Sequence, residues 1–180
     1  NITRTAYSPL VYEYKDYAVG ITDPAGRLIC QCTGGMPVFI ADVLSAAIRD
    51  GLEIYGREDI HAGDVIISNH AGTIGQHLNN MAMYTPIFAD PDGTDRRKDQ
   101  GTNLVAFMVV FVHWLDVGGK VVGSISGSAT DIFQEGIQFR TIKLWSKGEK
   151  VPEIYRMIEH NTRFPDMVFG DMEAQLAGCL

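Results

Sequence analysis

The stretch LVAFMVVFVHWL, residues 104–115, decides the fold, because it is the longest β-prone run and holds no polar group before His113. Its apolar part ends at Val112 and is about half as long as the roughly 20 residues that a membrane helix requires. Branched and aromatic side chains favour strands. The stretch therefore predicts a buried strand, long enough to lie at the centre of a sheet.

Shorter segments on both sides predict the rest of the fold. Pro24 and Gly26 stand where a type I turn favours them, between two β-prone runs, and so predict a hairpin. Apolar residues recur at three and four positions over 38–54, which predicts a helix that ends near Gly56. Pro152 and Pro165 suit the first turns of two later helices. The β-prone runs are 17–22, 27–33, 64–68, 81–88 and 139–145. We expect one α+β (mixed α/β) domain over residues 1–180, with a mixed β-sheet of hairpin and crossover connections covered by helices.

Composition excludes several classes of protein. The 180 residues include 22 acidic and 15 basic side chains, a formal net charge of −7, which leaves no cationic surface for nucleic acid. No run is long enough for a membrane span. Cys30, Cys32 and Cys179 are odd in number and form no CxxC pair, which is typical of reduced thiols in the cytoplasm. The chain opens at Asn1 inside a structured pattern, so we expect it to be part of a longer protein.

Two polar clusters could carry chemistry. Residues 69–80 hold His70, His77 and several carboxamides between two β-prone runs, and burying such a loop without a ligand is costly. His113 and Asp116 lie at the exit of the most apolar run, and strand ends are common places for sites. If the strands are neighbours, His77 and His113 converge, and imidazole with carboxylate suits zinc, manganese or iron. A neutral histidine also serves as a hydrogen-bonded strut or as a general base, and spacing alone does not decide between these roles.

The sequence lacks the motifs of a phosphate-binding loop and of a serine nucleophile. The glycines at 118–127 match neither GxGxxG nor GxxxxGK[ST]. The serines at 124–128 lack the pattern of a nucleophile elbow, which makes a serine triad improbable. The glycines therefore more simply let the backbone turn tightly.

A series of motifs runs through nearly the whole sequence. They are RTAYSP at 4–9 with Glu13 and Asp16, DPAGRL at 23–28, GDVIISN at 63–69, QHL at 76–78, TPIFAD at 85–90, HWLDVGG at 113–119, DIFQEG at 131–136 and GDMEAQ at 170–175. In their order and number these motifs resemble the hydantoinase B, oxoprolinase and ketone carboxylase family, in the amino-terminal part of its large B-type subunit.

The resemblance implies partners and a reaction class. Such a subunit works with a hydantoinase A-like subunit that binds ATP, and ketone carboxylases add a small third subunit. The substrates are small molecules, either cyclic amides such as hydantoins and 5-oxoproline or ketones such as acetone and acetophenone. Phosphoryl transfer from ATP activates a weakly reactive oxygen, and water or bicarbonate completes the reaction.

The resemblance also implies a divalent metal, zinc or manganese. Ketone carboxylases hold it through a His-Leu-Pro-Asp motif and a later histidine, which fall on His77 to Asn80 and on His113 here. Asn80 replaces the family's aspartate with a neutral, weaker ligand. His70 stands where relatives have an aspartate, so it is a candidate substitute ligand beside His77 and His113, and three imidazoles favour zinc. Asp116 would orient an imidazole or act as a base together with His113.

We therefore expect part of the catalytic subunit of an ATP-dependent ketone carboxylase, inactive as a fragment. The preference for carboxylation rests on the His-Leu-Asn-Asn and His-Trp-Leu-Asp segments, which depart from the usual hydantoinase form. One alternative is a subunit of an ATP-dependent cyclic-amide hydrolase. Another is a non-catalytic scaffolding module whose metal site has decayed, with Asn80 as its trace.

Overall fold

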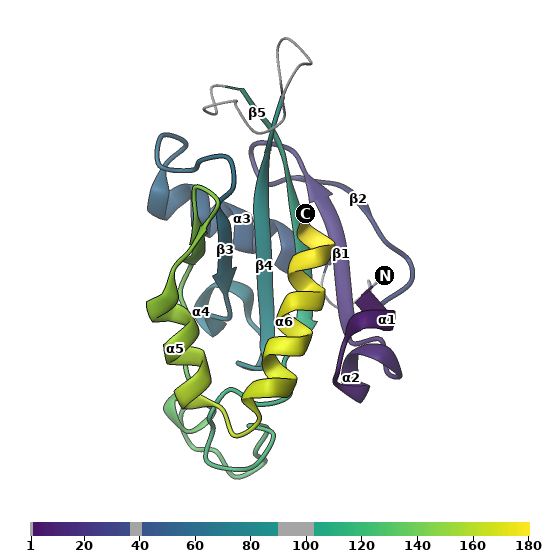
Figure 1. Cartoon of the computed structure of the whole chain (residues 1–180), viewed down its shortest axis with the longest axis vertical. Coiled ribbons are helices and arrows are strands. Elements are labelled where there is room, and N and C mark those ends of the chain that lie inside the picture. Colours follow the sequence, from purple (N-terminus) through teal and green to yellow (C-terminus); the bar gives the residue numbers. More distant parts are fainter. Residues whose placement is uncertain (1, 37–40, 90–102) are drawn as a thin grey trace.

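A computed structural model describes residues 2–36, 41–89 and 103–180, and Figure 1 shows their arrangement. The α+β class is confirmed: helices cover a seven-stranded sheet. The helices are α1 (Ile2–Thr5), α2 (Pro9–Tyr12), α3 (Ala41–Tyr55), α4 (Ala71–Ile74), the 3-10 turn η2 (Ile132–Gln134), α5 (Pro152–Asn161) and α6 (Pro165–Cys179). The strands are β1 (Tyr17–Thr22), β2 (Leu28–Gln31), β3 (Val65–Ser68), β4 (Asn80–Phe88), β5 (Leu104–His113), β6 (Ile142–Ser146) and β7 (Glu149–Lys150).

The strand order is β2-β1-β5-β4-β3-β6-β7, and every pairing between these strands is antiparallel. The predicted hairpin is confirmed as β1 and β2, with Asp23 closing its turn through Oδ1, which accepts from the N–H groups of Ala25 and Arg27. β5 lies between β1 and β4, as its apolar sequence predicts. This placement brings the start of β1, the end of β5 and the start of β4 to the same end of the sheet.

Both faces of the central strands are buried. On one face Met83 of β4 and Val110 of β5 pack in a cluster with Met172 of α6. On the other face Phe111 of β5 packs in a second cluster with Leu44 of α3. Successive side chains of a strand point to opposite faces, so a strand covered on both sides reads as a continuous apolar run. Figure 1 shows α6 and α3 on opposite sides of the sheet.

The structure moves some boundaries. The helix predicted over 38–54 is α3, and its first positions, 38–40, lie outside the described residues. The strand predicted from residue 139 begins only at Ile142, because Phe139 pairs through its N–H and carbonyl with Asn69 instead of a neighbouring strand. Among the described residues, no helix is long and apolar enough to cross a bilayer.

Candidate functional site

His77 and His113 meet at the end of the sheet where β4 begins and β5 ends. Nε2 of His77 lies 3.1 Å from Nδ1 of His113, and the ring centroids are 5.0 Å apart. His113 is the last residue of β5 and is buried, whereas His77 lies in the turn before β4. The convergence expected from the order of the two strands is therefore present.

Asp16 adds a carboxylate to this pair. Its Oδ2 lies 3.4 Å from Nδ1 of His113, and its carbonyl accepts the N–H of His113 at 3.2 Å. Asp16 immediately precedes β1 and follows Lys15, whose φ of 56° turns the chain into the strand. A second contact fixes its main chain, because the N–H of Asp16 donates to the carbonyl of Leu10. The same Nδ1 of His113 thus has an imidazole nitrogen and a carboxylate oxygen beside it.

Asn80 lies directly opposite His113 in the pairing of β4 with β5, and such cross-strand partners share one face of the sheet. Its Nδ2 donates to Oε1 of Gln76 at 3.3 Å. Its Oδ1 is buried and has no hydrogen-bond partner among the described residues. A buried acceptor without a partner costs about 1–3 kcal/mol, so this oxygen favours a donor or a cation beside it.

The surroundings of His77 favour its neutral form. Burial lowers the pKa of His77, and the neighbouring His113 lowers it further, whereas Asp16 and Glu135 act in the opposite direction. Two ring nitrogens at 3.1 Å can share one proton as a hydrogen bond but repel when both rings are protonated. A neutral imidazole is the form that binds metal.

The donor set fits a divalent cation in type and in part in geometry. Ligands about 2.1 Å from a metal, at angles of roughly 90–110°, lie about 3.0–3.4 Å from one another, and the two distances at His113 fall in this range. Within the described ranges, no three or more His, Cys, Asp and Glu side chains converge as a complete metal site. His77 and His113 therefore form the established pair, and Asp16 and Asn80 are its neighbouring oxygen donors.

His70 has its hydrogen bonds elsewhere. Its Nδ1 lies 3.0 Å from Oγ1 of Thr73, and Thr73 donates to Oδ1 of Asp50 at 3.3 Å. Asp50, on α3, also pairs with Arg140 and accepts a short hydrogen bond from Thr141. The described contacts thus direct His70 toward α3, and its role as a substitute ligand stays a prediction.

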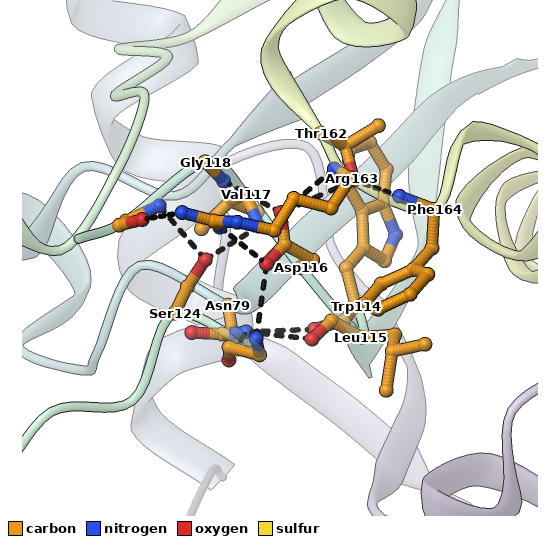
Figure 2. Close-up of polar contacts among 12 residues, drawn as sticks. Asn79, Trp114, Leu115, Asp116, Val117, Gly118, Ser124, Thr162, Arg163 and Phe164 are labelled. Atoms are coloured by element: carbon orange, nitrogen blue, oxygen red, sulfur yellow. Dashed lines mark hydrogen bonds and ion pairs between the residues drawn. The ribbon is translucent and has the colours of Figure 1, made fainter. Parts of the chain in front are cut away.

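Asp116 lies at the centre of a separate hydrogen-bond network, shown in Figure 2. Oδ1 accepts from the N–H groups of Gly118 and Arg163 and from the hydroxyl of Thr162. Oδ2 accepts from the N–H of Gly123 at 3.0 Å and from Nη1 of Arg163 at 2.9 Å. Asp116 is fully buried, so these donors replace the water that a carboxylate needs.

This network defines what Asp116 can do. Burial alone raises the pKa of Asp116, but the hydrogen bonds from Arg163, Gly118 and Gly123 together lower it. Five donors occupy the two oxygens, and none of them belongs to His77 or His113. The geometry therefore makes Asp116 an anchor for the chain that follows β5, and its predicted part in catalysis stays a prediction.

Two polar residues of α6 also reach this end of the sheet. Asp171 accepts the N–H groups of Tyr7 and Ser8 on Oδ1, at 2.7 and 2.9 Å, and its buried Oδ2 has no partner in the described part of the chain. Oε1 of Gln175 accepts from Nε1 of Trp114 at 3.0 Å. Sequence reasoning missed both roles, although Asp171 and Gln175 are spaced one helical turn apart, among the buried apolar residues of the helix rather than on its exposed side.

The geometry and the fold agree with a family assignment. The model of the family described as Hydantoinase B/oxoprolinase matches residues 1–180, and the chain belongs to this family. It is 25% identical to the caprolactamase subunit beta of Pseudomonas jessenii over 99% of this chain and 28% of that protein. It is 29% identical to 5-oxoprolinase 1 of Arabidopsis thaliana over 82% of this chain and 10% of that protein. The chain spans less than a third of the length of these curated relatives.

Solved structures show the same fold. An acetone carboxylase solved without nucleotide superposes with a TM-score of 0.85 at 19% identity, over 99% of this chain and 22% of that chain. An ATP-dependent caprolactamase from Pseudomonas jessenii superposes with a TM-score of 0.79 at 25% identity, over 99% of this chain and 29% of that chain.

Proposed function

We propose that this chain is part of the catalytic subunit of an ATP-dependent cyclic-amide hydrolase and that it binds a divalent cation between His77 and His113. The observation that carries the proposal is the 3.1 Å separation of Nε2 and Nδ1 of the two rings, with Oδ2 of Asp16 at 3.4 Å from the same Nδ1. Two histidines at this spacing, with the buried His113 beside a carboxylate, match the ligand types of zinc and manganese.

Each residue has a definite part in this proposal. His77 and His113 would hold the cation through ring nitrogens, and Asp16 would supply the negative charge that Asn80 lacks. Oδ1 of Asn80, which has no partner in the described structure, is available as a neutral oxygen ligand. When bound, the cation would act as a Lewis acid toward a carbonyl oxygen or an attacking water. Zinc and manganese both remain candidates, since two imidazoles suit zinc and added oxygen donors suit manganese.

Sequence relatives favour the cyclic-amide class over the ketone class. The caprolactamase subunit and the plant 5-oxoprolinase, both named for cyclic amides, align with this chain at 25% and 29% identity. Acetone carboxylase aligns at 19%, which supports the shared fold alone. Ketone carboxylation, the reaction first expected from the sequence, is the second candidate.

The proposal includes partners. A hydantoinase A-like subunit would bind ATP and transfer its phosphoryl group, and the subunit name of the caprolactamase relative supports a multi-subunit enzyme. A small third subunit belongs only to the ketone carboxylase alternative. The cation site would then hold the small-molecule substrate at the position where the A-type partner activates it.

The reaction class is tested on the full-length subunit purified with its natural partner. ATP hydrolysis is measured with hydantoin, 5-oxoproline or caprolactam, and separately with bicarbonate and acetone or acetophenone. We expect stimulation by a cyclic amide. Stimulation only by a ketone with bicarbonate would replace the first candidate with the second, and no stimulation by either would favour the scaffolding alternative.

The cation site is tested by metal analysis of the same complex. We expect stoichiometric zinc or manganese in the parent and a loss of at least about tenfold in affinity for His77→Ala and His113→Ala. His160→Ala, which changes an exposed histidine of α5, is the matched control and keeps the metal. A parent without metal, or histidine variants that retain it, would refute the site.

Two variants distinguish a site weakened by the amide of Asn80 from a site in which His70 replaces the missing aspartate ligand. They are Asn80→Asp and His70→Ala. A large gain of metal in Asn80→Asp means that the parent site is weakened by the amide. If Asn80→Asp leaves the stoichiometry unchanged and His70→Ala lowers it, His70 is the substitute ligand.

A further inference from the structure

We infer that α6 is the positioning element of this site: Asp171 and Gln175 set the relative positions of Asp16, His113 and His77 through two chains of hydrogen bonds. The inference rests on the proposed cation site for its consequence in metal binding, but the contacts themselves are independent of it. The two residues lie on one helix, four positions and about one turn apart.

The first chain runs from Asp171 to Asp16. Oδ1 of Asp171 accepts the N–H of Ser8, and Ser8 caps α2 by accepting the N–H of Leu10 on its Oγ. The carbonyl of Leu10 then accepts the N–H of Asp16 at 2.9 Å, and the carbonyl of Asp16 accepts the N–H of His113. One carboxylate on α6 therefore fixes the short helix that delivers Asp16 to the rim of the sheet.

Close packing supports this first chain. A Cβ added to Gly170 would lie 2.3 Å from the ring of Tyr7, so the residue next to Asp171 has to be glycine for the N-terminal segment to lie against α6. Tyr7 also donates its N–H to Oδ1 of Asp171 at 2.7 Å. The segment that precedes Asp16 is thus held to α6 by two hydrogen bonds and by direct contact.

The second chain runs from Gln175 to both histidines. Oε1 of Gln175 accepts from Nε1 of Trp114, the residue after His113, and Trp114 is 1% exposed. The N–H of Trp114 donates to the carbonyl of Asn79 at 2.8 Å, and Nδ2 of Asn79 donates back to the carbonyl of Trp114. The N–H of Asn80 donates to the carbonyl of His77 and closes the turn that carries this ring.

Gln175 also bridges the two central strands, β4 and β5. Its Nε2 donates to the carbonyls of Met81 on β4 and Val110 on β5, each at 2.8 Å. One buried amide thus contacts the strand that follows His77, the strand that ends in His113, and the indole beside His113. A hydrophobic side chain of similar size would fill the same volume but hold none of these three groups.

The experiment uses the full-length subunit in its complex, and the probe is Zn²⁺ in competition with a chelator. We expect Asp171→Ala to weaken Zn²⁺ binding about 10- to 100-fold, as loss of an outer partner typically does. Asp171→Asn should restore most of the affinity, because its amide oxygen can accept the same two N–H groups. Trp114→Phe, which removes the indole donor and leaves a smaller ring in the core, should also weaken binding. Glu173→Gln changes an exposed carboxylate on the same helix and should match the parent.

A second readout does not need the metal. The ring ¹⁵N signals of His77 and His113 report their shared hydrogen bond, and we expect Asp171→Ala and Trp114→Phe to shift them while Asp171→Asn and Glu173→Gln do not. Parent-like Zn²⁺ affinity and ring signals in a folded Asp171→Ala protein would overturn the inference, as would the same result for Trp114→Phe if Asp171→Ala does not fold. A parent that binds no Zn²⁺ refutes the cation site, and the ring signals then decide the role of α6 alone.

Discussion

Replacing Asp116 with asparagine tests whether this carboxylate acts as an anchor. Asparagine keeps the size of the side chain and one acceptor oxygen but replaces the other oxygen with an NH₂ group. The less damaging orientation places the NH₂ at the Oδ2 position, where it faces the donors of Gly123 and Arg163. Both of those hydrogen bonds are then lost, together with the ion pair.

The cost follows from the surroundings of the two donors. Among the described residues, the N–H of Gly123 has Asp116 as its acceptor and is partly buried, and leaving such a donor unsatisfied costs up to about 3 kcal/mol. The side chain of Arg163 is 38% exposed, so water replaces much of its contact with Asp116, and this part costs only about 1 kcal/mol. We therefore expect Asp116→Asn to lower the free energy of unfolding by about 2–4 kcal/mol.

Urea unfolding of the full-length subunit at several pH values measures this difference. Because the pKa of Asp116 is lowered on folding, its stabilisation is complete above the unfolded value of 3.8 and is lost as the pH falls through the lower folded value. The difference between parent and variant should therefore be largest near pH 7 and shrink below pH 3.8. Asp59→Asn, at an exposed aspartate, is the control and should leave the midpoint unchanged.

The catalytic reading of Asp116 predicts a different result. If Asp116 served as a base, the asparagine variant would keep most of its stability and lose turnover per folded molecule. A loss of stability below about 1 kcal/mol combined with a large fall in kcat would refute the anchoring argument.

Two further outcomes follow from packing and burial. Burial raises the pKa of Cys179 to about 12, while Cys30 and Cys32 are exposed, so a thiol reagent at pH 8 should modify two cysteines of this region quickly and Cys179 only after unfolding. Gly51→Ala would place a methyl 2.0 Å from the hydroxyl of Tyr84 and should cost about 1–3 kcal/mol in thermal or urea unfolding. Tyr84→Phe should itself change the free energy of unfolding by less than about 1 kcal/mol, because the hydroxyl of Tyr84 has no partner among the described residues. In the double variant it should relieve the cost of Gly51→Ala. A double variant no more stable than Gly51→Ala would contradict the steric explanation.

Local chemistry explains which parts of the fold were predictable. The strand in residues 104–115, the hairpin around Pro24 and Gly26, and the helices after Pro152 and Pro165 each carry their own signal, because periodicity and turn residues act within a few positions. The pairing of β1 with β5 carries no such signal, since it joins segments from opposite parts of the chain. Phe139 shows the same limit, because its pairing with Asn69 shortens a strand that its sequence favours.

The candidate site also has parts that the sequence predicts and parts that it does not. The meeting of His77 and His113 follows from neighbouring strands, and the sequence predicts it on that condition. Asp16 belongs to a recognisable motif, but its place beside His113 depends on the pairing of β1 with β5. Whether a carboxylate faces hydrogen-bond donors or a reaction centre depends on residues remote in sequence. The contact of Asp116 with Arg163 therefore belongs to the tertiary structure and has no local signal in the sequence.

The position of β5 between β1 and β4 also has a consequence for the order of assembly. Asp16 and His77 lie on opposite sides of this strand and are both synthesised before it, so neither finds His113 until the late strand has inserted between its earlier neighbours. If the proposed cation needs all three groups, only a chain whose central sheet is complete would bind it. Loading with metal would then report correct folding, and incompletely folded subunits would stay empty.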